Sequence, residues 1–137
     1  GATSVMEYKR MGYVPEALVN YIAHLGWSSG DEKEIFSKEE LIKEFTLGKI
    51  SKHAAVFSME KLNWFNSEYL KKMSIDSLIK MLLPFLKEAN YIENEESLSP
   101  TKNEYIKEVL KLMQGRIKNF SQFINYVCLF STQVLER

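Results

Sequence analysis

The sequence has little cysteine, little histidine and no excess of charge. Of its 137 residues, one is cysteine (Cys128) and two are histidine. A single cysteine excludes an internal disulfide framework and a cysteine-rich zinc site, and it favours a reducing, cytoplasmic setting. Basic and acidic residues number 18 each, so the formal net charge is zero. This balance excludes a protein that binds nucleic acid through bulk positive charge, but it leaves room for a local basic patch.

Long apolar runs and an N-terminal targeting signal are absent as well. No run approaches the roughly 20 apolar residues of a membrane-spanning helix. Residues 1–6 lack the basic and apolar regions of a secretory signal. The chain starts with Gly1 rather than methionine, and we expect it to be a piece of a longer protein. Hydrophobic residues make up 45% of it, which is enough for a packed core and argues against disorder.

Helical periodicity dominates the first part of the sequence. Pro15 suits a first helical turn, and apolar residues, Ile22 among them, follow at helical spacing until Gly26 ends the helix. Ser37 begins a capping box, with a glutamate three residues later, and Ser58 is placed to cap another helix. The sequence therefore predicts three helices in this part.

The second part of the sequence is more uniformly helical. Its apolar spacing predicts helices over three stretches: 76–89, 104–117 and 121–134. In the first part, by contrast, residues 55–57 have the composition of a short extended strand. We therefore expect a boundary near residues 67–74, between a loop-rich part and a helical bundle.

No set of residues indicates catalysis. His24 and His53 have no acidic or cysteine partner at metal-binding spacing, and no glycine-rich phosphate loop is present. Cys128 lies in an apolar run and is expected to be a buried structural thiol. We therefore predict no catalytic residue and no metal ligand in this chain.

A basic and aromatic cluster is the first candidate for binding. Residues 45–59 contain no acid, and this stretch carries Lys52. Lys61 follows soon after, and Trp64 lies three residues beyond it, so both project from one side of a helix. A cation beside an aromatic surface suits a phosphate and sugar contact with RNA. A half-buried tryptophan that anchors the helix, with solvated lysines around it, explains the same residues.

A second group of basic residues follows later in the chain. Lys107 and Lys111 are i, i+4 neighbours on the predicted helix, and Arg116 lies near its end. Favourable charge at a helix C-terminus explains Arg116 without any ligand, but it explains Lys107 poorly.

Several segments resemble one family. Residues 1–8, Gly-Ala-Thr-Ser-Val-Met-Glu-Tyr, are similar to the segment that follows the lysine-serine-lysine loop of bacterial-type glutamyl-tRNA synthetases. Later segments agree with the same family in order and spacing. They are 12–28 (beginning Gly-Tyr-Val-Pro-Glu-Ala-Leu), 34–37 (Glu-Ile-Phe-Ser), 55–66 (ending Glu-Lys-Leu-Asn-Trp-Phe-Asn), 69–70 (Tyr-Leu) and, more weakly, 83–86 (Leu-Pro-Phe-Leu) and 112–116 (Leu-Met-Gln-Gly-Arg).

The resemblance implies a class I aminoacyl-tRNA synthetase of the cytoplasm. Full-length members use ATP and Mg²⁺ to attach glutamate to tRNA-Glu, and some also charge tRNA-Gln. Their Rossmann-type catalytic domain is absent here, so we expect this piece to be inactive and monomeric, without a cofactor of its own. The implied fold is mainly α: a stem-contact domain with one or two short strands over residues 1–70, followed by a helical-bundle anticodon-binding domain over residues 71–137.

The resemblance also implies roles for single residues. Lys61 and Trp64 match a segment that lies against the D-stem side of tRNA, where they would contact phosphate and ribose. Arg116 matches an arginine near the third anticodon base, and its donors suit the acceptors of cytosine. With Lys52, Lys107 and Lys111, these residues form the predicted tRNA-binding set. The alternative is a helical protein-interaction module with no role in RNA binding.

Overall fold

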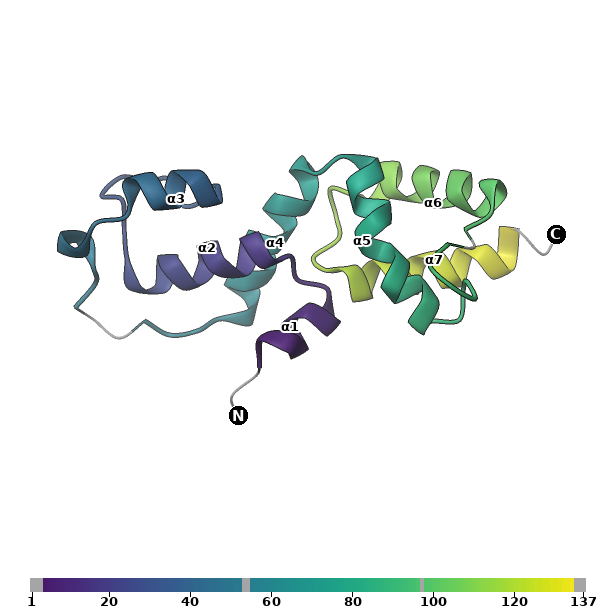
Figure 1. Ribbon diagram of the computed structural model, residues 1–137, viewed down its shortest axis with the longest axis horizontal. Coiled ribbons are helices and arrows are strands. Elements are labelled where there is room, and N and C mark those ends of the chain that lie inside the picture. The colour runs from purple at the N-terminus through teal and green to yellow at the C-terminus, as the bar shows by residue number, and fades with distance from the viewer. Residues whose placement is uncertain (1–3, 53–54, 97, 135–137) are drawn as a thin grey trace.

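The computed structural model describes residues 4–52, 55–96 and 98–134, and this part of the chain is helical (Figure 1). Helices α2 and α3 lie at one end, α5, α6 and α7 lie at the other, and α4 runs between them. In chain order the elements are α1 (Val5–Met11), α2 (Pro15–Gly26), α3 (Lys38–Glu44), the short 3₁₀ helix η1 (Leu47–Lys49), α4 (Met59–Lys72), α5 (Ile75–Glu88), α6 (Pro100–Met113) and α7 (Phe120–Val134).

Serine side chains determine where most of these helices begin. The hydroxyl oxygen of the serine before the helix accepts the backbone N–H of the residue three positions later, which satisfies one of the free donors of the first turn. This arrangement precedes α1, α3, α4, α5 and α6, at Ser4, Ser37, Ser58, Ser74 and Ser99. The capping box predicted at Ser37 and the cap predicted at Ser58 are confirmed. Helix α6 begins at Pro100, earlier than the predicted residue 104, because Ser99 caps it and proline suits its first turn.

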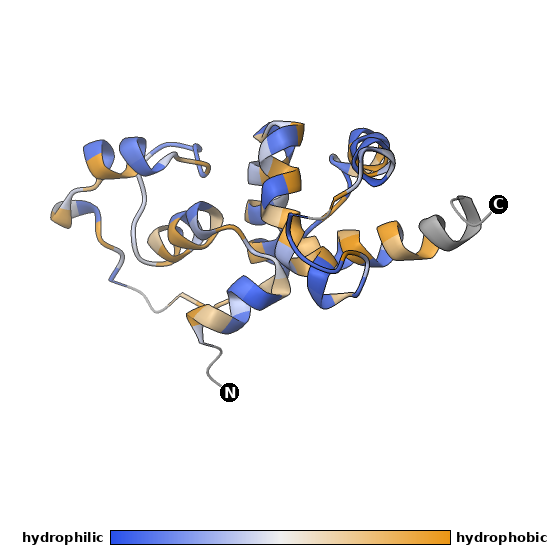
Figure 2. Cartoon of the chain, turned by 45° about the vertical axis from the view of Figure 1, so that its right-hand side comes forward, coloured by the Kyte–Doolittle hydropathy of each residue, from blue (hydrophilic) through white to orange (hydrophobic). Residues whose placement is uncertain are grey.

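The core consists of one large aliphatic cluster and two smaller aromatic ones. In the large cluster, apolar residues of α5, α6 and α7 pack together, and Val14 and Ala17 of the first part join them. Tyr21 and Phe65 belong to the second cluster, between α2 and α4, and Trp27 belongs to the third. Hydrophobic and hydrophilic residues alternate along the helices, as expected for helices with one buried face (Figure 2).

The expectation of one or two short strands is wrong for the described residues. Residues 55–57 do not pair with another strand. Across all the described residues, the only β-type pairing is a single bridge between Trp27 and Ile50. Instead, the ring of Phe57 packs 5.2 Å from that of Tyr21, while Val56 is 87% exposed. The segment has a strand-like composition, but it packs on a helix and has no neighbouring strand to pair with.

Asn66 of α4 links the connection before α2 to the connection before α7. Its side-chain oxygen accepts the backbone N–H of Val14 at 2.9 Å, and its amide donates to the carbonyls of Gly12 at 3.3 Å and Lys118 at 2.6 Å. The α1–α2 connection and the α6–α7 connection are therefore tied to the same fully buried side chain.

No helix in the described part of the chain is long and apolar enough to cross a membrane.

Candidate functional site

Lys61 and Trp64 form a half-exposed pair on the first two turns of α4. The Lys61 ammonium nitrogen lies 4.5 Å from the centre of the Trp64 ring, which is within cation–π distance. The indole is 40% exposed and meets Phe65 edge to face at 5.2 Å between ring centres. The prediction that Lys61 and Trp64 lie on one side of the helix is confirmed. Because Phe65 is fully buried, the indole packs against a side chain that the core holds in place.

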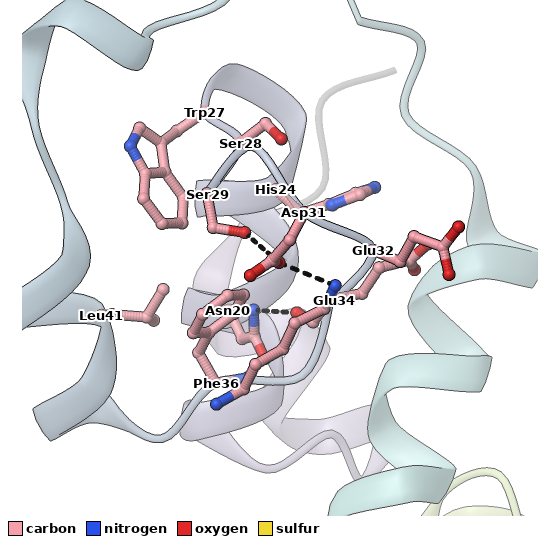
Figure 3. A pocket seen from close by; sticks show the side chains of 11 residues that line it. Asn20, His24, Trp27, Ser28, Ser29, Asp31, Glu32, Glu34, Phe36 and Leu41 are labelled. Atoms are coloured by element: carbon pink, nitrogen blue, oxygen red, sulfur yellow. Dashed lines mark hydrogen bonds between the residues drawn. The ribbon is translucent and has the colours of Figure 1, made fainter.

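Lys61 is also paired with Glu34, which comes from the segment before α3. The ammonium nitrogen lies 2.6 Å from the Glu34 carboxylate. Asn20 of α2 fixes this segment: its amide donates to the Glu34 carbonyl at 3.0 Å (Figure 3), and its oxygen accepts the N–H of Phe36 at 2.8 Å. The Tyr69 hydroxyl of α4 donates to the Asn20 side-chain oxygen at 2.9 Å. Burial raises the pKa of Tyr69 to about 12, so the hydroxyl keeps its proton and remains a donor.

A small cleft of about 110 Å³ lies beside this segment, lined by α2, the following loop and Leu41 of α3 (Figure 3). Asp31 closes its loop by accepting hydrogen bonds from the Ser29 hydroxyl at 2.7 Å and the Lys33 backbone N–H at 2.9 Å. These two bonds lower the pKa of the Asp31 carboxyl. The carboxylate therefore stabilises the loop.

Lys52 has no recorded contact with the Lys61–Trp64 pair. It is exposed, and it makes no hydrogen bond or ion pair with any described residue. Its neighbour in the acid-free stretch, Lys49, donates to the carbonyl of Ser29 at 2.8 Å. His53, which belongs to the same stretch, lies outside the described residues.

The basic residues of α6 and the following turn have a different environment. Lys107 lies 3.9 Å from Glu104 and 4.0 Å from Asp76, and Lys111 lies 3.0 Å from Glu108. Both lysines therefore pair with carboxylates of their own helix, an arrangement common on solvated helix surfaces.

Arg116 lies in the turn between α6 and α7, close to the end of α4. It is exposed and forms no ion pair with the described residues. The side-chain amide of Gln114, two residues earlier, donates to the carbonyls of Leu70 at 2.8 Å and Met73 at 2.7 Å. The turn that carries Arg116 is therefore fixed to the C-terminal end of the helix that carries Lys61 and Trp64.

Catalytic and metal-binding chemistry has little support among these residues. Within 4–52, 55–96 and 98–134, no three His, Cys, Asp or Glu side chains are grouped so as to hold a metal ion. Cys128 is partly rather than fully buried, and burial raises the pKa of its thiol, so it is a poor nucleophile. The donor set of these described residues does not fit a Mg²⁺–ATP site.

Comparison with known proteins identifies the family of the chain. A family described as tRNA synthetases class I (E and Q), catalytic domain, matches residues 2–64, a range that ends at Trp64. The glutamate–tRNA ligase of Desulforamulus reducens is 39% identical over 130 residues, and that of Heliobacterium modesticaldum is 41% identical over the same length. The chain belongs to the glutamate–tRNA ligase family. It spans about a quarter of the length of these relatives, 27% and 26%, while the matches cover 95% of the chain.

A solved structure of this family has the same fold. The glutamate–tRNA synthetase of Elizabethkingia anophelis superposes with a TM-score of 0.71 at 38% identity, covering 86% of this chain and 22% of that one. The helical arrangement described above is therefore shared with a solved glutamate–tRNA synthetase.

Sequence reasoning missed the residues that surround the candidate cations and fix their positions. Glu34 was noted only as part of the Glu-Ile-Phe-Ser segment, and Asn20 and Gln114 were given no role. The available signal for Asn20 was a polar residue on the otherwise apolar face of a predicted helix. Glu34 had no such signal, because its contact with Lys61 is made only by the tertiary fold.

Proposed function

We propose that this chain is the tRNA-binding portion of a cytoplasmic, monomeric glutamate–tRNA ligase. It holds tRNA-Glu so that the acceptor end reaches a Rossmann-type catalytic domain elsewhere in the full-length enzyme, where ATP and Mg²⁺ act. The observation that carries the proposal is the Lys61–Trp64 pair, an ammonium 4.5 Å above a half-exposed indole in a chain of this family. Such a pair offers charge for phosphate and a flat surface for ribose or base.

The proposal divides the work between two parts of the chain, which correspond to the proposed stem-contact (1–70) and anticodon-binding (71–137) domains. Lys61 and Trp64, with Lys52, contact the phosphate backbone and fix the register of the RNA without reading its sequence. Arg116 donates to acceptors of an anticodon base, with Lys107 and Lys111 on the phosphates nearby. Supporting this division, Arg116 is exposed and unpaired among the described residues, while Gln114 fixes its turn to the end of α4.

Titration of fluorescently labelled tRNA-Glu with the chain at low salt tests the proposal. We expect weak binding that falls steeply as salt rises.

Lys61→Ala should weaken binding to tRNA-Glu and to its anticodon variants alike. Arg116→Ala should cost about 1–3 kcal/mol only for the matching anticodon. No binding at low salt, together with no raised absorbance at 260 nm on purification, would favour a protein-interaction module. Equal losses across anticodon variants for both substitutions would contradict the division of work.

A further inference from the structure

The Lys61 ammonium already has an anionic partner in the free chain. The Glu34 carboxylate lies 2.6 Å from it. The two side chains are 35% and 39% exposed as a whole, but the Glu34 oxygen that faces the ammonium is itself buried, so a ligand must move the carboxylate to reach the ammonium from that side. A lysine in such a pair presents much less net charge to an approaching polyanion than a free lysine does.

The pair depends on the fold rather than on local sequence. The backbone carbonyl of Glu34 accepts a hydrogen bond from the side-chain amide of Asn20, a residue that is only 1% exposed. Lys61 lies on the first turn of α4, where its backbone N–H donates to the Ser58 hydroxyl. The backbones of both partners are therefore fixed, and the carboxylate occupies the position from which a phosphate oxygen would approach the ammonium.

We propose that Glu34 is a specificity-determining residue that occupies the phosphate position beside Lys61 until RNA replaces it. This rests on the proposed function of Lys61 and Trp64. An RNA strand gains from the site only if it brings both a phosphate for the ammonium and a ring or ribose for the indole. A polyanion without a stacking surface must displace Glu34 with no compensating contact. Glu34 thereby weakens binding of polyanions in general and leaves the preference for RNA to Trp64.

Glu34→Gln, which removes the charge and keeps the shape, tests the proposal. We expect its affinity for tRNA at low salt to rise about three- to fivefold, the scale of an exposed ion pair. The slope of log K against log salt should steepen by up to about 1, because Lys61 then releases its own counterion. Affinity for heparin, a polyanion without bases, should rise at least as much. Glu34→Asp, which keeps the charge, should bind like the parent chain.

Glu68→Gln is the matched control. It removes one negative charge from a carboxylate on α4 that lies 2.9 Å from Lys71. In a Lys61→Ala background, Glu34→Gln should have no effect beyond that of Glu68→Gln, because the two residues act as a pair.

The indole N–H resonances of the only two tryptophans, Trp27 and Trp64, give a measurement that needs no RNA. Glu34→Gln should move the Trp64 resonance, assigned through Trp64→Phe, while the Trp27 resonance stays in place and shows that the fold is intact.

The possible results separate the two proposals. If the parent chain binds tRNA but Glu34→Gln binds equally or more weakly, or gains no more than Glu68→Gln, the role of Glu34 is refuted and the proposed function stands. If neither the parent chain nor Glu34→Gln binds tRNA at low salt, the proposed function fails and the role of Glu34 fails with it. A gain that is confined to Glu34→Gln and lost in the Lys61→Ala background supports both.

Discussion

Around α2 and α4, buried asparagine side chains connect helices to loops, whereas α5, α6 and α7 pack through apolar residues that are mostly aliphatic, with Phe120 and Phe123 among them. Asn20 and Asn66 are the buried polar side chains of the described chain, with exposures of 1% and 0%. Hydrogen bonds are directional, so they fix the geometry of irregular segments such as the one that carries Glu34. Aliphatic packing is non-directional and suits helices that only need to stay together. The part of the molecule with the more irregular backbone is thus the part held by specific polar contacts.

The candidate cations differ between these regions in the same way. Lys61 contacts a carboxylate and an aromatic ring that are positioned by tertiary structure. Lys107 and Lys111 contact carboxylates one turn away on their own helix. The first environment needs the N-terminal fold, whereas the contacts with Glu104 and Glu108 would also exist in an isolated helix; only the approach of Asp76 to Lys107 at 4.0 Å comes from another helix. This difference makes Lys61 the stronger candidate for a built binding site.

Gly12→Ala should have the largest effect, because it opens the junction between the two regions. Gly12 has a φ of +92°, and an added Cβ would lie 2.4 Å from the backbone nitrogen of Phe120, which donates to the Gly12 carbonyl. We expect the free energy of unfolding, measured with urea, to fall by about 3 kcal/mol or more. Gly115→Ala is the matched control: it meets no atom within 4 Å and should change stability by less than about 0.5 kcal/mol. Similar losses for both substitutions would show that the junction is not tight.

Asn66→Ala should have the next largest effect, because it removes a polar tie and leaves the helices themselves intact. The substitution leaves the N–H of Val14 and the carbonyl of Lys118 without this partner, and the Gly12 carbonyl keeps only the N–H of Phe120. We expect a loss of about 2–3 kcal/mol in the free energy of unfolding. Asn103→Ala on α6 changes the same side chain at a partly exposed position and should cost less than about 0.5 kcal/mol. If Asn66→Ala is equally mild, the asparagine contacts do not hold this region.

The features that sequence could predict are the local ones. The caps at Ser37 and Ser58 and the side-by-side placement of Lys61 and Trp64 depend only on spacing within one helix. Burial was less predictable. Ile22 has the spacing of a buried residue but is 54% exposed, because periodicity identifies the apolar face and not how much of it another helix covers.

Long-range contacts were beyond sequence reasoning. The prediction of a strand at residues 55–57 is wrong, because a strand needs a neighbouring strand to pair with, and the composition of a segment does not show whether one is present. Glu34 and Gln114 act through partners far away in the sequence, Lys61 for the first and the end of α4 for the second. Nothing in the local sequence distinguishes either residue, although both lie in segments that carry the family resemblance.

Lys111→Ala should have the smallest effect, and it tests whether the two kinds of lysine differ. Its i, i+3 contact with Glu108 is exposed, so its loss should change the free energy of unfolding by about 0.3 kcal/mol. Its effect on tRNA affinity, measured in the titration used for Lys61→Ala, should be about twofold at low salt and should vanish at high salt, because only the exposed contact with Glu108 positions the ammonium. Lys61→Ala should lose more affinity and keep part of that loss at high salt, since the indole contact that it supports is not screened. Equal salt dependence for the two variants would mean that Lys61 acts as an ordinary surface charge, and that its position over Trp64 contributes nothing to binding.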